Sequence, residues 1–352
     1  MPSPLIELTN TDRAVYAERL RDFLPPQVVD VHTHVYRVQD IRAIAPAGEA
    51  RTVTWPDLVA RENPIEHLLE TYRVLLPAQQ VTPVIFASLP SGDNQDALNA
   101  YVADSAREHQ LPALLFSHPA WSAEELRRRL LADGFLGVKS YLTMAPDYLP
   151  AGEIRIFDIF PPHQLEELNR LHAIVMLHIP RSGRLKDPVN LGQMLEIDRN
   201  YPDLQVIIAH VGRAYCDTDA GDAFAQLRQT RHLRFDICAN TNAHIFTQLI
   251  ECVGPQRILF GSDMPITRMR MRRITRDGHY VNLVPRGLYG DVSNDPNMGE
   301  VDGDEAAQLT TFLYEEILAF REASEATGLT ANEVEDVFYA NAMRLFNEVR
   351  LS

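Results

Sequence analysis

The chain has 352 residues, of which 45% are hydrophobic and 23% are charged, and its formal net charge is −15 at pH 7. A chain of this length can bury a large core, and α/β barrels of this size often form one domain. The absence of a long polar tract excludes bulk disorder, and the negative charge argues against non-specific binding to nucleic acid or anionic membranes.

The N-terminal residues and the cysteines predict a cytoplasmic protein. The first twenty residues lack the basic segment and apolar run of a signal peptide. No apolar stretch approaches the roughly 18 residues that would cross a bilayer. The cysteines Cys216, Cys238 and Cys252 have no CxxC spacing and an odd count, which favours a reducing compartment.

Short apolar, β-branched runs recur along the chain and predict eight strands. They cover residues 28–35, 82–89, 112–117, 136–142, 173–179, 206–211, 234–239 and 258–263. Amphipathic segments between these runs predict helices over 94–109, 122–132, 163–172, 190–200, 223–231 and 242–253. Ser122, followed by AEE, is the expected N-cap of its helix.

Strand–helix alternation repeated eight times implies parallel strands joined by right-handed crossovers. It favours a single distorted (β/α)8 barrel domain over residues 1–352, with an open doubly wound sheet as the alternative. Two segments interrupt the repeat, 36–63 after the first strand and 264–304 after the eighth. We expect both to be long rim loops that act as lids or binding loops. Helices over 305–325 and 331–349 are expected to close the barrel.

Ionisable side chains stand at the ends of four predicted strands. The first strand ends in DVHTH, and the alternation of a strand points His32 and His34 to the same side. His178 ends the fifth strand, His210 the sixth and Asp263 the eighth. One such histidine alone would be interpreted as a core residue. Five such groups at one rim indicate a metal site, and imidazole with carboxylate suits Zn²⁺ best, with Mn²⁺, Fe²⁺ or Co²⁺ as alternatives.

The motifs VDVHTH, LHIP, IIAHVG and LFGSDMP, together with VFYANAMRLF near the C-terminus, resemble the amidohydrolase superfamily. The resemblance runs from about residue 30 to residue 346. It is closest to the branch that contains aminocarboxymuconate semialdehyde decarboxylase, the resorcylate decarboxylases and several lactone hydrolases. It implies that His32, His34, His178 and Asp263 bind metal. It also implies that His210 assists catalysis beside one metal or binds a second.

Lys139, in GVKSY at the end of the fourth predicted strand, bears on the metal count. Binuclear members of the superfamily carry a carboxylated lysine at this place that bridges two metals, and GVKSY resembles that pattern. The alternative is an unmodified cation that anchors a substrate carboxylate or pairs with an acid. A lysine that points into a barrel is costly unless it is paired. We therefore expect one or two ions.

Several further side chains are candidates for substrate binding. Guanidinium groups that follow the fifth and sixth strands match carboxylates bidentately, although such arginines also anchor loops through ion pairs. Aromatic side chains near the rim could stack on substrate or pack in the core or lid. The candidates are Arg181, Arg184, Arg213, Tyr141, Arg286 and Tyr289. The arginine run within 268–273 is interpreted as solvated.

These observations predict a metal-dependent hydrolase that cleaves a C–O or C–N bond beside a carbonyl. The expected partner is a small anionic or carbonyl substrate: an organic acid, a lactone or a sugar-acid derivative. Asp263 would take a proton from water and pass it to the leaving group, and His210 would hold the oxyanion. One alternative is non-oxidative decarboxylation of an unsaturated or aromatic acid, and another is a non-catalytic binding barrel. The resemblance also allows a homo-oligomer.

Overall fold

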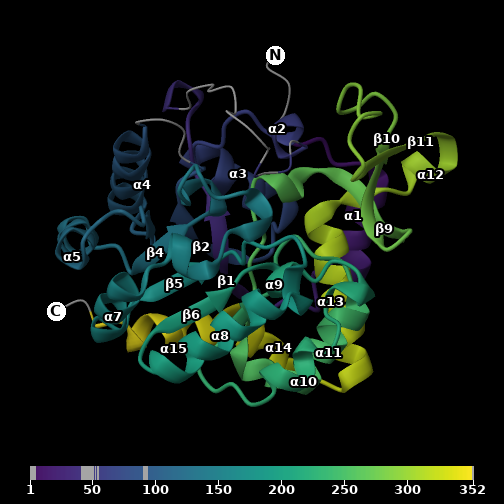
Figure 1. The fold of residues 1–352 in the computed structure, drawn as a ribbon. Helices are drawn as coiled ribbons and strands as arrows, with labels where there is room; N and C mark the ends of the chain where they lie inside the picture. The colour runs from purple at the N-terminus through teal and green to yellow at the C-terminus, as the bar shows by residue number, and fades with distance from the viewer. Residues whose placement is uncertain (1–4, 41–50, 52, 54, 90–93, 351–352) are drawn as a thin grey trace.

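The computed structural model describes residues 5–40, 51, 53, 55–89 and 94–350 (Figure 1). Each of the eight predicted strands is present there, and most are shorter than expected. They are β1 (Gln27–His34), β2 (Gln80–Phe86), β3 (Leu114–Phe116), β4 (Gly137–Ser140), β5 (Ile174–Leu177), β6 (Gln205–Ile208), β7 (Arg234–Asp236) and β8 (Ile258–Leu259).

The eight strands follow one another in chain order around a closed ring. β1 pairs with β2 in parallel, and β3 to β8 form one six-stranded parallel sheet. The Ile85 N–H donates to the Pro112 carbonyl at 3.0 Å and links β2 to the start of β3. The Val31 N–H donates to the Phe260 carbonyl at 3.0 Å and links β1 to the segment after β8. The predicted barrel is therefore confirmed, and the open sheet is wrong.

Alternating side chains of the strands fill two apolar layers. In β5, Ile174 and Met176 belong to the cluster inside the barrel, whereas Val175 and Leu177 belong to the layer under the helices. Strands buried on both faces need continuous apolar runs, which explains their sequence pattern. Ala342 and Leu345 of α15 (Asn341–Glu348) pack on the interior cluster, so this last helix covers the barrel as predicted.

The helices lie around the outside of the strands (Figure 1). The Ser122 hydroxyl accepts the Glu125 N–H at 3.1 Å, which confirms Ser122 as an N-cap. The longer helices are α3 (Ile65–Leu75), α4 (Gln95–His109), α5 (Ala123–Ala132), α7 (Pro162–Arg170), α8 (Pro188–Asn200), α11 (Ala243–Val253) and α13 (Phe312–Thr327). The shorter ones are α1 (Asn10–Val15), α2 (Pro56–Val59), α6 (Ile156–Ile159), α9 (His210–Arg213), α10 (Ala223–Leu227), α12 (Gly303–Ala307) and α14 (Ala331–Glu335).

The segment after β8 is not the loop that the sequence analysis predicted. It forms β9 (Arg270–Arg276), β10 (His279–Pro285) and β11 (Met298–Val301), which we call the β-ribbon. β9 and β10 pair antiparallel across a turn at Asp277 and Gly278, both of which have positive φ. An Asp-Gly pair between β-rich runs is a strong hairpin pattern. The β-ribbon lies beside α1 and α12 (Figure 1).

The helix predicted over 305–325 is also interrupted. α12 ends at Ala307, and β12 (Thr310–Thr311) pairs with β9 before α13 begins at Phe312. β12 joins the edge of the β-ribbon sheet, whose order is β11-β10-β9-β12. This pairing anchors the β-ribbon to α13 and therefore to the barrel.

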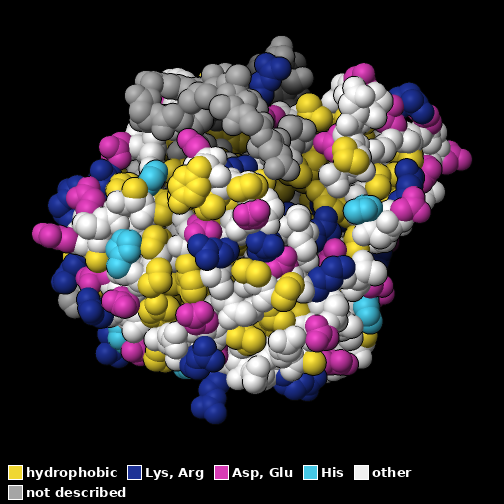
Figure 2. Space-filling view, in the orientation of Figure 1, with side chains coloured by type: hydrophobic (Ala, Val, Ile, Leu, Met, Phe, Trp, Pro, Cys, Tyr) yellow, Lys and Arg dark blue, Asp and Glu magenta, His cyan; other side chains and the backbone are white. Residues whose placement is uncertain are grey.

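The insertion after β1 falls partly outside the described residues, at 41–50, 52 and 54. Its described part includes α2, and Trp55 just before α2 is buried against Met271 and Val284 of the β-ribbon. Both insertions therefore meet at the same end of the barrel. Within the described residues, no helix combines the length and apolar character that crossing a membrane requires. Acidic and basic side chains are interspersed over the face in Figure 2.

Candidate active site

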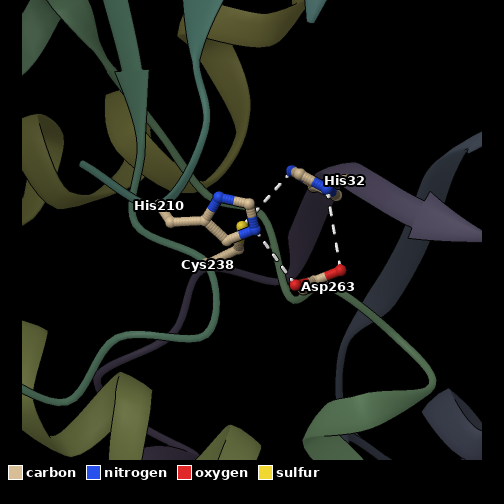
Figure 3. Close-up of side chains that lie close together, drawn as sticks. All are labelled: His32, His210, Cys238 and Asp263. Atoms are coloured by element: carbon tan, nitrogen blue, oxygen red, sulfur yellow. Dashed lines mark hydrogen bonds and ion pairs between the residues drawn. The ribbon is translucent and has the colours of Figure 1, made fainter. Parts of the chain in front are cut away.

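The five predicted ligands converge at the C-terminal ends of β1, β5, β6 and β8. Asp263 is at their centre: its Oδ1 lies 3.4 Å from His34 Nε2 and 3.6 Å from His32 Nε2. Its Oδ2 lies 3.1 Å from His210 Nε2 (Figure 3). The ring of His178 lies 5.1 Å from that of His210, centroid to centroid. We call these five residues the histidine cluster.

Unusual backbone conformations aim these side chains. His210 has φ of 56° and lies two residues after β6, and Asp263 has φ of 60° and lies four residues after β8. Positive φ is uncommon for residues other than glycine and costs about 1–3 kcal/mol at each position. The Asp263 N–H donates to the His32 carbonyl at 2.8 Å, which fixes this turn against β1. Strain of this kind is typical of functional sites.

Gly261, in the LFGSD motif, allows the eighth strand to approach the first. A Cβ atom at this position would lie 2.8 Å from the Cβ of His32 and 3.4 Å from the Cβ atoms of Asp236 and Cys238. Contacts of 2.8 Å between carbon atoms are not tolerated without movement. Glycine is therefore required for the close packing of the strands that carry the histidine cluster.

Burial favours the neutral form of two of the imidazoles, those of His32 and His178. Burial, followed by the charge of Lys139, lowers the pKa of His32 to about 4. Burial, followed by the charge of Arg213, lowers the pKa of His178 well below its usual value. Burial by itself would raise the pKa of Asp263, but His32, His210 and His34 together hold it well below the usual range. At neutral pH His32 and His178 are thus neutral imidazoles and Asp263 is a carboxylate, the protonation states that bind metal.

A carboxylate on the seventh strand orients two members of the cluster. Asp236 Oδ2 accepts from His32 Nδ1 at 2.8 Å, and Asp236 Oδ1 accepts the backbone N–H of His210 at 2.7 Å. His34 Nδ1 donates to the Ala87 carbonyl at 2.8 Å. Because these partners occupy Nδ1 of both β1 histidines, Nε2 is left with a free lone pair toward the cluster. Asp236 is not among the site residues predicted from the sequence.

Two buried nitrogens in the cluster have no hydrogen-bond partner among the described residues, His178 Nε2 and His210 Nδ1. Leaving a buried polar atom unpaired costs about 1–3 kcal/mol. A divalent transition metal would accept the lone pair of a neutral imidazole nitrogen and relieve that cost. The donor set of the histidine cluster therefore fits a metal centre.

Cys238 is a further buried donor that the sequence analysis did not place here. Its Sγ lies 3.3 Å from His32 Nδ1, and it follows Asp236 by two residues. Ligand atoms of Cys238, His32, His210 and Asp263 all lie within 4.8 Å of one another (Figure 3). Both Asp236 and Cys238 stand at the end of the seventh strand, the same signal by which the other cluster residues were found.

Lys139 is the third of the four residues of β4, and its side chain is directed into the barrel. It is 1% exposed, and its Nζ lies 5.6 Å from the centre of the Phe86 ring. Its ammonium forms no hydrogen bond or ion pair with another described residue. Burial lowers the pKa of Lys139, and the charges of Asp263 and Asp236 oppose that shift. This position is compatible with a carboxylated lysine and with an unmodified amine.

Two of the predicted substrate-binding residues, Tyr141 and Arg213, lie beside His178 of the histidine cluster, and Arg184 lies one aromatic ring away from it. The ring of Tyr141 is 4.3 Å from that of His178. Arg213 donates to the carbonyls of three residues after β5, at 3.1–3.2 Å. Arg184 pairs with Asp219 at 2.5 Å and lies 5.3 Å from the ring centre of Tyr215, which itself is 6.4 Å from the ring of His210.

The other three are engaged elsewhere. Arg181 pairs with Asp187 at 3.1 Å, and the Tyr289 hydroxyl accepts the Arg270 N–H at 2.7 Å. Arg286 is 60% exposed and pairs with Glu300 and Asp302. The structure therefore does not bring Arg181, Arg286 or Tyr289 to the histidine cluster.

The expectation that the arginine run within 268–273 is solvated is wrong for Arg273, whose guanidinium packs among aromatic rings. Its guanidinium carbon lies 4.4 Å from the ring centre of Tyr280, 4.9 Å from that of Tyr215 and 4.6 Å from that of Phe312. Because β9 alternates, neighbouring arginines point to opposite sides, and tertiary packing selects one for burial. Tyr215 and Tyr280, whose rings contact Arg273, are likewise not among the residues predicted from the sequence.

The barrel resembles those of several solved structures. A probable 2-pyrone-4,6-dicarboxylic acid hydrolase of Acinetobacter baumannii with citric acid bound is 17% identical, with a TM-score of 0.54 over 91% of this chain and 99% of that one. A 4-oxalomesaconate hydratase of Rhodopseudomonas palustris is 16% identical, with a TM-score of 0.54 over 91% and 96%. A 2,6-dihydroxybenzoate decarboxylase of Rhizobium is 15% identical, with a TM-score of 0.52 over 92% and 99%.

At these identities the structural likeness shows the fold and not the reaction. No curated protein matches the chain. The family model described as amidohydrolase matches residues 29–285, a span that begins just before the histidines of β1 and includes His178, His210 and Asp263. This match covers most of the chain and contains every residue of the histidine cluster. The chain therefore belongs to the amidohydrolase family, as an enzyme with a metal-type site at the mouth of its barrel.

Proposed function

We propose that this protein is a metal-dependent hydrolase that cleaves a C–O or C–N bond beside a carbonyl. The observation that carries the proposal is the convergence of His32, His34 and His210 on the carboxylate of Asp263, with His178 beside His210. Zn²⁺ suits this donor set best, and Mn²⁺, Fe²⁺ and Co²⁺ are alternatives. The three free, buried cysteines are in keeping with a cytoplasmic enzyme.

A divalent metal held by His32, His34, His178 and Asp263 would activate a water and polarise the substrate carbonyl. Asp263 is a carboxylate at neutral pH, so it can take the proton of the attacking water and later give it to the leaving group. His210 contacts Asp263 at 3.1 Å, which lets it fix the orientation of that carboxylate and face the developing oxyanion. Asp236 keeps His32 in the tautomer that leaves Nε2 free.

The surroundings of the cluster favour an anionic substrate. Arg213 and Tyr141 stand on the side of His178, and Arg184 stands beside Tyr215. Guanidinium groups bind carboxylates with two parallel hydrogen bonds. A small organic acid or a lactone that carries a carboxylate matches these groups. A sugar-acid lactone belongs to the same class.

Non-oxidative decarboxylation of an aromatic or unsaturated acid is the second candidate. It is favoured by the absence of a carboxylate partner for Lys139 among the described residues, because an unmodified lysine could hold a substrate carboxylate. Carboxylation of Lys139 would instead replace a buried cation with an anion that can hold a second metal. Metal content therefore separates the two cases. Hydrolysis is supported if the enzyme binds two equivalents of metal, if the second equivalent requires bicarbonate during loading, and if Lys139→Met binds only one.

The direct test combines metal analysis with a substrate screen. The purified enzyme should carry one to two equivalents of divalent metal, and His178→Ala should lose most of it. His244→Ala is the matched control, because His244 lies on the exposed side of α11 and bonds only to Gln248. Two assays should be run in parallel: ring opening of carboxylated lactones, and CO₂ release from dihydroxybenzoates. CO₂ release without ring opening would replace hydrolysis with decarboxylation, and full metal content in His178→Ala would overturn the ligand set.

A further inference from the structure

A pocket of about 400 Å³ opens between the N-terminal segment and the start of the β-ribbon. Its walls come from residues within 5–9, from 59–62 at the end of α2, from Arg268 just before β9, from Leu288 after β10 and from Thr311 of β12. None of the residues that line this pocket belongs to the histidine cluster. A ligand bound here would therefore be separate from the one at the metal centre.

Arg268 gives this pocket a cation that has no acidic partner among the described residues. Its Nη2 donates to Asn63 Oδ1, whereas its Nε is buried and neither Nε nor Nη1 makes a hydrogen bond to a described residue. Arg270, which also lines the pocket, is by contrast paired with Asp12 at 2.6 Å. Burial lowers the pKa of Arg268 to about 10. A guanidinium removed from water without a counter-ion is costly, and an anion in the pocket would relieve that cost.

The guanidinium of Arg268 is held in place before a ligand arrives. Its partner Asn63 is 0% exposed and donates from Nδ2 to the His34 carbonyl at 2.6 Å. The backbone N–H of Arg268 donates to the Pro265 carbonyl at 3.1 Å. Thr311 is 1% exposed, and its hydroxyl has no hydrogen-bond partner among the described residues. A fixed guanidinium loses little side-chain entropy when it binds an oxyanion, and this favours a carboxylate ligand.

The other walls of the pocket select the body and the charge of the ligand. Leu5 is 36% exposed and Leu288 is 54% exposed, so both present apolar surface that a ligand can cover. Glu7 and Glu62 also line the pocket, and neither forms an ion pair with a described residue. These two acids would repel a second negative charge on the ligand. The pocket therefore matches a single carboxylate that carries an apolar chain.

We propose that this pocket binds an aliphatic monocarboxylate, with the carboxylate on Arg268 and the chain against Leu5 and Leu288. The site is distinct from the substrate site at the histidine cluster and does not depend on the proposed function.

Binding of hexanoate to the zinc-loaded enzyme, measured by calorimetry, tests this proposal. Hexanoate should bind at least about tenfold more tightly than hexan-1-ol, which lacks the charge, as expected for charge-assisted hydrogen bonds. It should also bind at least about tenfold more tightly than acetate, because each buried methylene group improves binding by up to about fourfold. Hexyl phosphate, which carries a second negative charge, should bind more weakly than hexanoate. Equal binding of hexanoate and hexan-1-ol overturns the proposal.

Two variants place the ligand within the pocket. Arg268→Gln should remove the preference for hexanoate over hexan-1-ol. Arg272→Gln is the matched control, because it removes the same charge from a side chain that is 42% exposed and does not line the pocket. Arg268→Gln also changes the contact with buried Asn63, so a second variant is made at an exposed position. Leu288→Asp puts a carboxylate beside the chain and should weaken hexanoate binding by at least about fivefold.

Removal of zinc separates this pocket from the metal centre. The affinity for hexanoate should stay within about twofold when a chelator is added, as expected for sites that share no residues. Binding that disappears with the zinc places the carboxylate on the metal and overturns the proposal. Unchanged hexanoate binding in folded Arg268→Gln or in Leu288→Asp overturns it as well.

Discussion

His32 Nδ1 lies 2.8 Å from Asp236 Oδ2, and neither side chain is more than 1% exposed. The other oxygen of the same carboxylate accepts the backbone N–H of His210. One acid of the seventh strand therefore fixes the ring of a histidine on the first strand and the main chain of a histidine after the sixth. Burial by itself would raise the pKa of Asp236, but His32 holds it below the usual value, so it remains a hydrogen-bond acceptor.

Asp236→Asn should weaken metal binding by about 10–100-fold, the usual cost of losing a carboxylate behind a metal-binding histidine. The asparagine amide can turn its NH₂ toward Nδ1 and favour the tautomer that carries the proton on Nε2. Zinc affinity should be measured by competition with a chelator. Asp222→Asn is the control, since Asp222 is exposed and its side chain bonds only to Gln226 among the described residues. Unchanged affinity in Asp236→Asn would show that His32 is oriented without this carboxylate.

Gly261→Ala should also reduce metal affinity, in this case by displacing β1. The added methyl group would meet the Cβ of His32 at 2.8 Å, and both atoms belong to tightly packed strands. We expect a loss of about 1–3 kcal/mol of stability together with weaker zinc binding. Gly192→Ala in α8 is the control, because nothing lies within 4 Å of that Cβ position. Equal zinc affinity in Gly261→Ala and Gly192→Ala would contradict the role assigned to Gly261.

The pKa of His32 predicts how acid affects the metal-free protein. His32 has a pKa of about 4 in the folded state, against an ordinary value of 6.5. Between these values the unfolded chain binds more protons, so acidification favours unfolding. The contribution of neutral His32 to the free energy of unfolding, measured as the difference between wild type and His32→Gln, should be fully present above pH 6.5. It should be lost as the pH falls through about 4. The loss amounts to about 3 kcal/mol.

Urea unfolding of both proteins at pH 7 and pH 4.5, in the presence of a chelator, measures this difference. Comparison with His32→Gln removes contributions that the two proteins share, such as that of Asp30, whose pKa is raised to about 6 by burial. A difference in unfolding free energy that does not change between the two pH values would show that His32 is not buried in its neutral form.

The barrel and the cluster were predictable because they depend on local pattern. Apolar strands alternate with amphipathic helices along the chain, and this alternation predicts the (β/α)8 order. A polar residue at the end of an apolar strand is easily recognised in the sequence. His32, His34, His178, His210 and Asp263 were identified in this way. Asp236 follows the same rule but was not predicted, because a single acid as the last residue of a three-residue strand resembles ordinary surface sequence.

The β-ribbon and the burial of Arg273 depend on tertiary contacts. The Asp277-Gly278 pair is a hairpin pattern in the sequence. The arginine-rich run before it lacks the apolar alternation by which a strand such as β9 is recognised. Which of two adjacent arginines is buried depends on Tyr215, Tyr280 and Phe312, which come from three separate segments. Single-sequence patterns do not contain such pairings.

Asp263→Asn should abolish turnover more completely than it weakens metal binding. Asparagine keeps an oxygen that can face the metal and the Nε2 atoms of His32 and His34, which lie 3.4–3.6 Å from Asp263 Oδ1. It cannot take a proton, however, and loss of a general base typically costs about 10²–10⁴-fold in rate. Asp263→Glu offers a comparison in which the base is kept but moved by one methylene group. Metal content, zinc affinity and kcat should be measured on all three proteins. An Asn variant that retains metal and keeps kcat within a few-fold of wild type would exclude Asp263 as the proton acceptor and leave His210 as the remaining candidate in the cluster.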